Sequence, residues 1–371
     1  MRICFFLRNI SLPSGIERVT SVVANRLAEK GMDVSIISLW GGLDPFYDKH
    51  EAVKLYQLFP GQVTEKNRVV AQGKRLGRFP AASHKLRKLL EKHPQDILID
   101  TDYLLGLAVL PAISGLNVKH IHWEHFNFNL DLDKPRKLLG RRLLARRTSA
   151  IVTLTERDVG YWQQGSRPRG PVTAIYNPVP FDCPDVEYDP DTRTVLAVGR
   201  LNRQKGFDYL LEAWAQVRAS ADSDQLQWQL LILGDGEEET ALKTQCRNLQ
   251  IENSVTFAPA TQDVDSYYRR ASMLAMTSRF EGFGMVLLEA QVYRLPTVAF
   301  DCDVGPAEII EHEKNGLLVS QGDIKGFSHQ LLRLMADREM RCHFSSKTDE
   351  SVDRFMPDPI ADRWIDLFKS L

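Results

Sequence analysis

Each half of this chain begins with the same pattern: an apolar run of strand type, a loop that contains glycine, and a helical stretch. In the first half, the run 3–7 leads through the loop 9–15 into the helical stretch 17–30. In the second half, the run 195–199 leads through a similar loop into the helical stretch 207–219. Further strand-like runs alternate with helical stretches, at 34–38, 97–99, 119–122, 150–154, 228–233, 255–257, 274–276 and 297–300. Such alternation predicts parallel sheets covered on both faces, so we expect an α/β protein with two doubly wound domains.

The length of the chain and its stretch rich in Pro and Asp indicate where these domains divide. At 371 residues the chain exceeds the size at which one hydrophobic core usually stops growing. The segment 176–180 ends the first series of strands, and a stretch rich in Pro and Asp follows it. We therefore predict an N-terminal domain over 1–177, a C-terminal domain over 178–354 and a terminal helix over 355–371.

The composition is typical of a soluble globular protein, with 43% hydrophobic and 26% charged residues. No run of ~18 apolar residues that could span a membrane is present. The apolar run 1–7 is too short for a signal peptide, so we interpret it as a buried strand. The five cysteines are scattered without C-x-x-C spacing, which argues against disulfides and structural zinc and predicts a cytoplasmic protein.

The stretch 278–289, Ser-Arg-Phe-Glu-Gly-Phe-Gly-Met-Val-Leu-Leu-Glu, places a glycine-rich turn between two carboxylates eight residues apart. If helix fills most of this gap, Glu281 and Glu289 lie about two turns apart and can face one cleft. Gly282 and Gly284 would let a ligand approach the backbone at the start of the helix. The alternative is an ordinary helix N-terminus with a first-turn acid and an unrelated surface Glu289.

The segments on either side place this stretch in a sheet. The run 273–278 before it and the run 297–300 after it are both of strand type. Strand, glycine turn, helix and strand make a βαβ unit, and ligands of such sheets bind at the carboxyl ends of the strands. Glu281 and Gly305 are both expected at such ends.

The stretch with Glu281 and Glu289 resembles the E-x7-E signature of family 4 glycosyltransferases, and the resemblance covers nearly the whole chain. Family members are retaining sugar-nucleotide enzymes of the GT-B fold, in which two Rossmann-like domains face each other across a cleft. The resemblance therefore implies donor binding mainly on the second domain and acceptor binding on the first. It also implies that the terminal helix, with Trp364 and Phe368 at helical spacing, crosses back to the first domain.

A second motif, 199–206 (Gly-Arg-Leu-Asn-Arg-Gln-Lys-Gly), follows a strand and ends where a helix begins. An Arg and a Lys five residues apart on such a loop can hold phosphate oxygens from different sides. The alternative is solvated surface charge. The motif is similar to the G-R-L…K-G motif of the family, which implies that Arg200 and Lys205 hold the donor diphosphate.

A third motif is Ser14-Gly15-Ile16-Glu17-Arg18, which opens the first helix. One glycine is weak evidence, and a helix entry capped by Ser14 or Gly15 explains it equally well. The motif resembles the first loop of the family, G-G-x-E-R, with Ser14 in place of the first glycine. The resemblance implies that the Gly15 backbone approaches the donor phosphate or the acceptor.

The segment 120–129 concentrates three histidines and three aromatic residues, Trp123, Phe126 and Phe128. Its spacing does not match a zinc helix, so we favour a pocket for a sugar or an acceptor. We assign acceptor binding to His122, Trp123, Glu124 and His125. The family carries a histidine near the transferred sugar, and the resemblance implies that this is His125, or else His122.

The sequence Asp301-Cys302-Asp303 spells D-x-D, a manganese motif of a different glycosyltransferase fold. Here it precedes 305–310, Gly-Pro-Ala-Glu-Ile-Ile, which is similar to a family 4 turn that binds no metal. We therefore expect no metal site and no cofactor. Gly305 would allow the sugar to approach closely.

The resemblance implies a role for each remaining motif residue. Glu281, His125, Arg200 and Lys205 would form the catalytic set, in which the two cations stabilise the leaving diphosphate. Glu289 would bind the ribose. The donor-binding residues implied are Gly15, Arg200, Lys205, Phe257, Ala258, Glu281, Gly282, Phe283, Gly284, Met285, Val286 and Glu289.

The net charge of −1 hides an asymmetry between the halves. Residues 1–177 carry 27 Lys and Arg against 16 Asp and Glu, whereas residues 178–371 carry 20 against 32. The stretch 134–147 alternates cationic and apolar pairs. It is either a solvated helix face or a surface for an anionic membrane or a polyprenyl-diphosphate acceptor. Nucleic acid is disfavoured because no known nucleic-acid module surrounds it.

These observations lead to one predicted function and three alternatives. We expect transfer of a sugar from a nucleoside diphosphate, with UDP favoured, to a hydroxyl of a lipid-linked saccharide. The resemblance to transferases of bacterial exopolysaccharide, capsule and O-antigen implies a protein peripheral to the cytoplasmic face of the inner membrane. The alternatives are a sugar-nucleotide epimerase of the same architecture, a non-catalytic sugar-binding protein, and a hydrolase with Glu281 and Glu289 as its acid and base.

Overall fold

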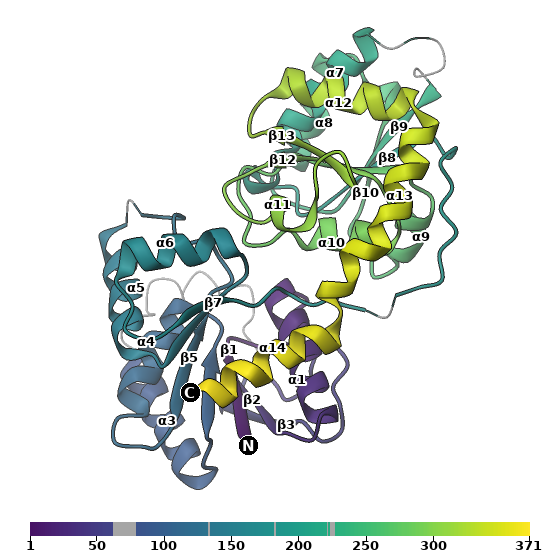
Figure 1. The fold of residues 1–371 in the computed structure, drawn as a ribbon. Helices are drawn as coiled ribbons and strands as arrows, with labels where there is room; N and C mark the ends of the chain where they lie inside the picture. The colour runs from purple at the N-terminus through teal and green to yellow at the C-terminus, as the bar shows by residue number, and fades with distance from the viewer. Residues whose placement is uncertain (62–78, 133, 182, 221, 223–226) are drawn as a thin grey trace. The chain divides into compact units, whose positions relative to one another are not determined.

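The computed structural model describes residues 1–61, 79–132, 134–181, 183–220, 222 and 227–371. Its contacts divide the chain into two compact units (Figure 1). Unit 1 comprises Met1–Pro180 and Phe355–Leu371, and unit 2 comprises Phe181–Arg354. The terminal helix thus belongs to the N-terminal unit, as predicted.

Unit 1 contains a parallel sheet of seven described strands in the order β3-β2-β1-β4-β5-β6-β7. The strands are β1 (Arg2–Leu7), β2 (Asp33–Trp40), β3 (Lys54–Phe59), β4 (Ile97–Asp100), β5 (Lys119–Trp123), β6 (Ala150–Thr153) and β7 (Val172–Ala174). The helices are α1 (Gly15–Glu29), α3 (Phe79–Lys92), α4 (Tyr103–Ala112), α5 (Pro135–Arg147), α6 (Glu156–Ser166) and α14 (Pro357–Ser370).

The helices of unit 1 form a layer on each face of the sheet. Helices α3, α4, α5 and α6 pack side by side, and α1 packs against α14 (Figure 1). The alternation of strand side chains matches these layers, because Cys4 and Phe6 of β1 face the core beneath α3 and α4. Phe5 points the other way and contacts Trp364 of α14, with ring centroids 6.4 Å apart. Burial on both faces explains why the strands read as continuous apolar runs.

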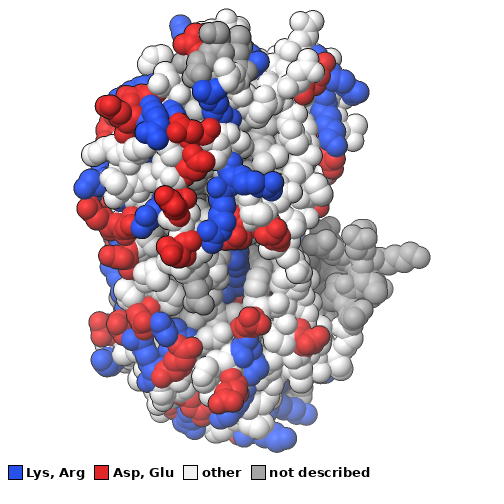
Figure 2. All heavy atoms as spheres, turned by 90° about the vertical axis from the view of Figure 1, so that its right-hand side faces the viewer, with Lys and Arg blue, Asp and Glu red and all other residues white. Residues whose placement is uncertain are grey.

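Charge is distributed unevenly over the surface. On the face drawn in Figure 2, acidic and basic side chains are interspersed. Helix α5 differs, because its sequence Pro-Arg-Lys-Leu-Leu-Gly-Arg-Arg-Leu-Leu-Ala-Arg-Arg contains six basic residues and no acidic one. None of the helices in the described part of the chain is long and apolar enough to cross a membrane.

Unit 2 contains a second parallel sheet, whose six described strands have the order β10-β9-β8-β11-β12-β13. The strands are β8 (Thr194–Val198), β9 (Gln229–Leu233), β10 (Val255–Ala258), β11 (Met273–Met276), β12 (Thr297–Asp301) and β13 (Gly316–Ser320). The helices are α7 (Phe207–Ser220), α8 (Glu239–Asn248), α9 (Asp265–Arg269), α10 (Met285–Val292), α11 (Pro306–Ile309), α12 (Ile324–Ala336) and α13 (Arg338–Val352).

The strand order of unit 2 reverses between β8 and β11. Connections run outward from β8 in one direction and from β11 in the other, as in a Rossmann fold. Loops that leave the carboxyl ends of these two neighbours therefore open a crevice at the topological switch point.

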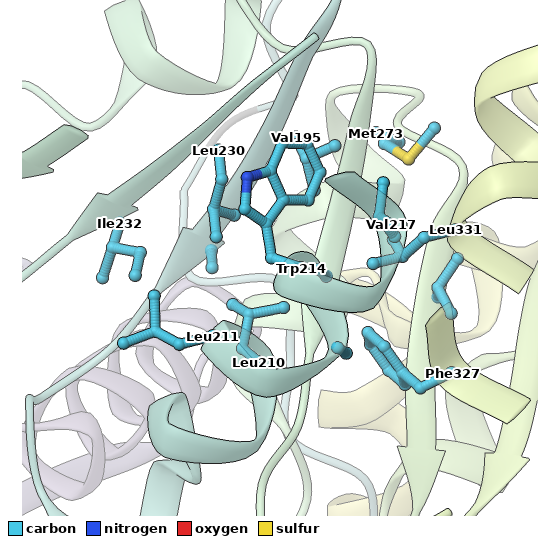
Figure 3. Packing of buried hydrophobic residues seen from close by; sticks show 14 of the residues in the cluster. Val195, Leu210, Leu211, Trp214, Val217, Leu230, Ile232, Met273, Phe327 and Leu331 are labelled. Atoms are coloured by element: carbon cyan, nitrogen blue, oxygen red, sulfur yellow. The ribbon is translucent and has the colours of Figure 1, made fainter. Parts of the chain in front are cut away.

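A hydrophobic core of unit 2 lies between its sheet and helices α7 and α12 (Figure 3). Trp214 of α7 is fully buried against strand side chains such as Leu230, and Phe327 and Leu331 of α12 close the cluster. The Trp214 indole N–H donates to Ser254 Oγ at 3.0 Å, so the polar atom is satisfied inside the core. This packing fixes α7, and with it the loop that precedes α7.

Candidate functional site

Two loops meet at the switch point of unit 2. The loop 199–206 leaves β8 and enters α7, and the loop 277–284 leaves β11 and enters α10. Strands β8 and β11 pair in parallel, so both loops emerge from the same edge of the sheet. The two sequence motifs with Lys205 and Glu281 are thus brought together.

A charged contact joins the two loops directly. The Lys205 ammonium donates to Glu281 Oε1 at 2.7 Å, and the Ser278 hydroxyl donates to the same oxygen at 2.6 Å. Glu281 is 7% exposed, so its carboxyl group is held in one place with little competition from water. Ser278, which the sequence did not mark as a site residue, orients the carboxyl group from within the same loop.

Backbone contacts hold the two loops at a fixed separation. The Arg279 N–H donates to Gln204 O at 2.8 Å, and the Gln204 amide donates back to Phe280 O at 3.1 Å. Gly206 has φ +64°, and a Cβ there would lie 2.1 Å from Thr277 O. Only glycine permits this approach, so the second glycine of the motif serves the packing of the loops.

A partly buried ion pair reinforces the same junction. The Arg279 guanidinium donates to both oxygens of Asp208, at 2.7 and 2.6 Å, and lies 3.9 Å from the centroid of Tyr209. The hydrogen bond with Asp208 raises the pKa of Arg279, and Arg279 lowers the pKa of Asp208 although burial would raise it. Neither residue was predicted, because 71 positions separate them and each looks like ordinary surface charge in the sequence.

The Arg200 side chain is accessible to a ligand at this edge of the sheet. It is exposed, and its guanidinium makes no hydrogen bond or ion pair with any residue that the structure describes. The loop beneath it is fixed by Leu201 N, which donates to Asp235 O at 2.8 Å. Arg200 and Lys205 can therefore present two cations from one rigid loop.

Helix α10 begins directly after the glycine-rich turn. It starts at Met285, after Gly284 with φ +98°, so residues 280–284 are not helical. Helix therefore fills the second half of the gap between Glu281 and Glu289 and not the first half. The structure instead leaves the backbone of Gly282 and Phe283 in a loop that precedes the N–H groups of Met285 and Val286, where a helix lacks internal acceptors.

Glu289 is not the surface residue of the alternative interpretation. It is 8% exposed on α10, and the Tyr268 hydroxyl donates to its Oε2 at 2.7 Å. Tyr268 stacks on Tyr293 with centroids 4.8 Å apart, which fixes the donor. The carboxylate of Glu289 is therefore held in a fixed orientation by a buried hydroxyl group.

The remaining predicted donor residues lie along the same sheet edge. Phe257 and Ala258 end β10 and are partly buried, and the Lys243 ammonium lies 5.8 Å from the Phe257 ring. Gly305 follows β12 with φ +108°, and a Cβ there would lie 2.3 Å from Phe283 O. Gly305 is thus required for packing against the loop of Glu281.

The D-x-D sequence lies at the end of β12. Asp301 is the last residue of that strand, and Cys302 is fully buried. Within the described residues, no group of three or more His, Cys, Asp or Glu is placed to hold a metal ion.

In unit 1, Gly15 begins α1 at the carboxyl end of β1. It is exposed, and no atom lies within 4 Å of where its Cβ would be. Ser14 occupies the N-cap position, but its hydroxyl makes no capping hydrogen bond and donates instead to Glu17. Ser14 is therefore the N-cap residue, as one interpretation expects, but its side chain does not cap the helix. Burial raises the pKa of Glu17.

The histidines on β5 belong to a buried charge cluster. His120 Nε2 and His122 Nδ1 each lie 2.7 Å from an oxygen of Asp100, and all three side chains are fully buried. Burial alone would lower the pKa of His122, but the Asp100 carboxylate raises it to about 10. The two histidines lower the pKa of Asp100 against the opposing effect of burial.

The same cluster organises the loop after β5. Arg141 of α5 lies 3.3 Å from Glu124 and donates to the carbonyl oxygens of Asn127, Phe128 and Leu130. Glu124 also lies 3.8 Å from His122 Nε2. Asp100 and Arg141 were not predicted, because a buried network is invisible until the strands are aligned.

This packing corrects part of the predicted acceptor pocket. Trp123 is fully buried, with its ring 5.0 Å from that of Trp364, and it presents no face to a ligand. His122 and Glu124 are committed to the buried cluster. His125 is 7% exposed and lies 4.3 Å from the Trp123 ring, and burial lowers its pKa to about 3.

The exposed aromatic side chain in this segment is Phe126, at 43%. Among the four predicted acceptor residues, buried ring nitrogens without a hydrogen-bond partner among the described residues occur in His122, Trp123 and His125, and of the two histidines only His125 has no bond to Asp100. A neutral imidazole there can exchange a hydrogen bond with a ligand, but it cannot act as a cation.

Comparison with known proteins now adds to this geometry. The family model described as "Glycosyltransferase Family 4" matches residues 13–182, and the one described as "Glycosyl transferases group 1" matches residues 183–351. An uncharacterized glycosyltransferase of Haemophilus influenzae is 36% identical over 363 residues, 98% of each chain. The chain belongs to the family 4 glycosyltransferases. The resemblance inferred from the motifs is thereby confirmed.

Two further relatives of this glycosyltransferase have assigned roles. The amylovoran biosynthesis glycosyltransferase AmsD of Erwinia amylovora is 29% identical and covers 99% of both chains. A Campylobacter jejuni α-1,4-N-acetylgalactosaminyltransferase, whose name specifies a diphospho-undecaprenol acceptor, is 25% identical over 99% of this chain and 98% of its own.

The solved structures confirm the architecture. Anabaena HepE in complex with UDP has a TM-score of 0.78 over the full length of both chains, at 19% identity. Sucrose-phosphate synthase of Thermosynechococcus elongatus gives 0.83 at 19% identity, over 100% of this chain and 98% of its own. The glycosyltransferase therefore has the GT-B architecture of two Rossmann-like domains and a C-terminal helix.

Proposed function

We propose that this glycosyltransferase moves a sugar from a nucleoside-diphosphate sugar, with UDP as the nucleotide, to a hydroxyl of a lipid-linked saccharide, with retention at the anomeric carbon. The observation that carries the proposal is the contact between Lys205 and Glu281 at the switch point of unit 2. It unites the phosphate motif and the E-x7-E motif at the edge where sheets of this type bind nucleotides.

The proposed chemistry uses the charges of that edge. As the bond from the anomeric carbon to the phosphate oxygen breaks, the leaving diphosphate gains negative charge. Arg200, which has no competing partner among the described residues, and Lys205 lie on one loop and would stabilise that charge. No step of this scheme requires a metal or a cofactor.

The same edge offers contacts for the rest of the donor. Glu281 and the N–H groups from Gly282 to Val286 would bind sugar hydroxyls, because they surround the start of α10. Glu289, oriented by Tyr268, would bind the ribose. Phe257 and Ala258, at the end of β10, would contact the base.

The acceptor assignment rests on different support. Gly15 and His125 lie at the carboxyl edge of the unit 1 sheet, where the open space around Gly15 leaves room for a ligand. Relatives that act in amylovoran biosynthesis and on a diphospho-undecaprenol saccharide make bacterial surface polysaccharide the favoured pathway class. We place the enzyme on the cytoplasmic face of the inner membrane for the same reason.

A thermal-shift experiment tests the donor site. Ligand at 100 times its dissociation constant should add about 2.7 kcal/mol of stability. UDP should stabilise the wild type with or without EDTA, and the Lys205→Met variant should lose this shift. Lys325→Met, an exposed lysine on α12, is the matched control and should retain it. A millimolar screen of UDP, GDP and ADP that shifts nothing would overturn the phosphate site.

Product analysis separates the remaining alternatives. With a labelled UDP-sugar and a lipid-linked saccharide, a transferase yields labelled lipid, whereas an epimerase changes the sugar nucleotide without any acceptor. A hydrolase yields free sugar, and a binding protein leaves the donor intact. NMR of the new linkage reports whether the anomeric configuration is retained.

A further inference from the structure

A group of large apolar side chains is exposed beside and along α5. Leu139 is 70% exposed, Leu143 43%, Phe126 43% and Leu132 40%. These are half of the eight large hydrophobic side chains that are exposed in the described structure, and all lie within 18 residues of sequence. Scattered exposed leucines are normal on a soluble protein, but a group of this kind marks a contact surface.

The exposed face of α5 is also strongly basic. Arg136, Leu139, Leu143 and Arg146 are exposed and follow each other at three- or four-residue spacing, so they share one side of the helix. Arg142 and Arg147 are exposed beside them. We call these six residues the α5 surface. Arg136, Arg146 and Arg147 make no ion pair with any described residue.

The opposite side of α5 satisfies the needs of the fold. Leu144 and Ala145 are buried in unit 1, Arg141 binds Glu124, and Lys137 binds Asp131 at 3.1 Å. Leu139 and Leu143 are therefore not needed for the packing of the core of unit 1. Cations near the C-terminus of a helix favour its dipole, which accounts for Arg146 and Arg147 but not for the leucines.

The neighbouring loop extends the basic area. Arg142 Nε donates to Gly165 O at 3.1 Å, and Arg169 N donates to Ala145 O at 3.0 Å. These bonds hold the exposed Arg167 and Arg169 beside the last turns of α5. In Figure 1, α5 and α6 lie next to each other on the outside of unit 1.

We propose that the α5 surface docks this glycosyltransferase on an anionic lipid bilayer, with Leu139 and Leu143 inserted among the lipids and the arginines bound to their headgroups. A helix with apolar residues centred among arginines suits the interface of a membrane. The side chains match such a surface in charge and in polarity. A nucleic acid would bind the arginines through its phosphates, but it would not bury the two exposed leucines.

Vesicle flotation with the full chain tests the proposal. The protein should bind vesicles that contain phosphatidylglycerol and should not bind phosphatidylcholine alone. Arg136→Gln with Arg146→Gln should weaken the binding roughly 30-fold, since each arginine contributes about fivefold near an anionic surface. Leu139→Gln with Leu143→Gln should weaken it roughly tenfold or more.

A matched control has the same change of charge elsewhere on unit 1. Lys88→Gln with Lys92→Gln alters two exposed lysines of α3 and should leave the binding unchanged. If this control weakens binding as much as the arginine variant, the attraction is general and the proposal is wrong. Binding that depends on the arginines but not on the leucines would also overturn it and would indicate a dissolved polyanion.

The result does not depend on the donor site. Each variant should keep the UDP-induced thermal shift of the wild type, because none of the altered residues lies in unit 2. A wild type that responds to UDP but ignores anionic vesicles would remove the membrane surface and leave the proposed reaction standing. Vesicle binding without a UDP-induced thermal shift would support the membrane surface and count against the proposed reaction.

Discussion

At the scale of single residues, the Glu281 carboxyl group carries the clearest prediction. It accepts hydrogen bonds from Lys205 and Ser278 through one oxygen, so its carboxylate is held at the edge where we propose that the sugar binds. Glu281→Gln keeps the size of the side chain and removes the charge. We expect kcat to fall roughly 100-fold, the magnitude typical of one lost transition-state contact.

The control for Glu281→Gln is a substitution of Ser278, which donates a hydrogen bond to the same Glu281 oxygen as Lys205. Ser278→Ala removes a hydrogen bond to Glu281 but keeps the carboxylate and its contact with Lys205, so kcat should fall much less. Steady-state kinetics and urea unfolding of both variants separate a catalytic effect from a loss of stability. Equal loss of activity in the two variants would contradict a specific role for the charge.

Two buried histidines predict how stability depends on pH. His125 has its pKa lowered to about 3, so the folded state excludes a proton that the unfolded chain binds below about pH 6.5. Stability should therefore fall as the pH drops below that value. His122 has its pKa raised to about 10, so the folded state keeps a proton that the unfolded chain loses, and stability should fall as the pH rises above about 6.5.

The two effects together place a maximum of stability near about pH 6.5, with slopes of up to about 1.4 kcal/mol per pH unit from each histidine. Urea unfolding between about pH 5 and about pH 8.5 measures both sides. In His125→Asn the acid side should flatten above about pH 5, since the carboxylates titrate lower. An acid side unchanged by this substitution would contradict the neutral state of His125.

At the scale of elements, Arg141 ties α5 to the loop after β5. Its guanidinium donates hydrogen bonds to Glu124 and to three carbonyl oxygens in the interior of unit 1. Arg141→Met should lower the free energy of unfolding by roughly 3–5 kcal/mol, because it leaves a buried carboxylate without its cation. Urea unfolding followed by far-UV circular dichroism gives the value.

The double variant tests this explanation. Glu124→Gln with Arg141→Met removes both charges, so its cost should be smaller than the sum of the two single variants. Additive costs would mean that the two side chains act independently, contrary to the contact in the structure.

The elements show which parts of the fold the sequence can predict. Ten strand-like runs correspond to β1, β2, β4, β5, β6, β8, β9, β10, β11 and β12, because strands buried on both faces are continuously apolar. The missed strands are β3, β7 and β13 at the edges of the sheets. β7 spans three residues, and β3 is mostly half-buried, so neither has the pattern of an interior strand.

The residues of the candidate site likewise divide into those that the sequence predicts and those that it misses. The donor loops could be predicted because their residues are close in sequence and precede helices. The contact of Arg279 with Asp208 and the cluster around Asp100 join residues that only the paired strands bring together. For the same reason, the sequence predicts Trp123 as a ligand contact, because it does not show that Trp364 of α14 covers this side chain.

At the scale of the whole molecule, the chain leaves unit 1 once and returns to complete it. Helix α14 follows unit 2 in sequence, yet Trp364 is buried between Phe5 and Trp123 in the core of unit 1. Trp364→Ala should therefore destabilise unit 1 by roughly 3–5 kcal/mol. Asp358 also binds Arg26 of α1 at 2.6 Å, but both side chains are partly exposed, so Asp358→Ala should cost less than about 1 kcal/mol. Denaturant unfolding of the two variants ranks apolar burial against ion pairing in holding the returning helix. A larger loss for Asp358→Ala than for Trp364→Ala would show that charge, not burial, attaches α14 to unit 1.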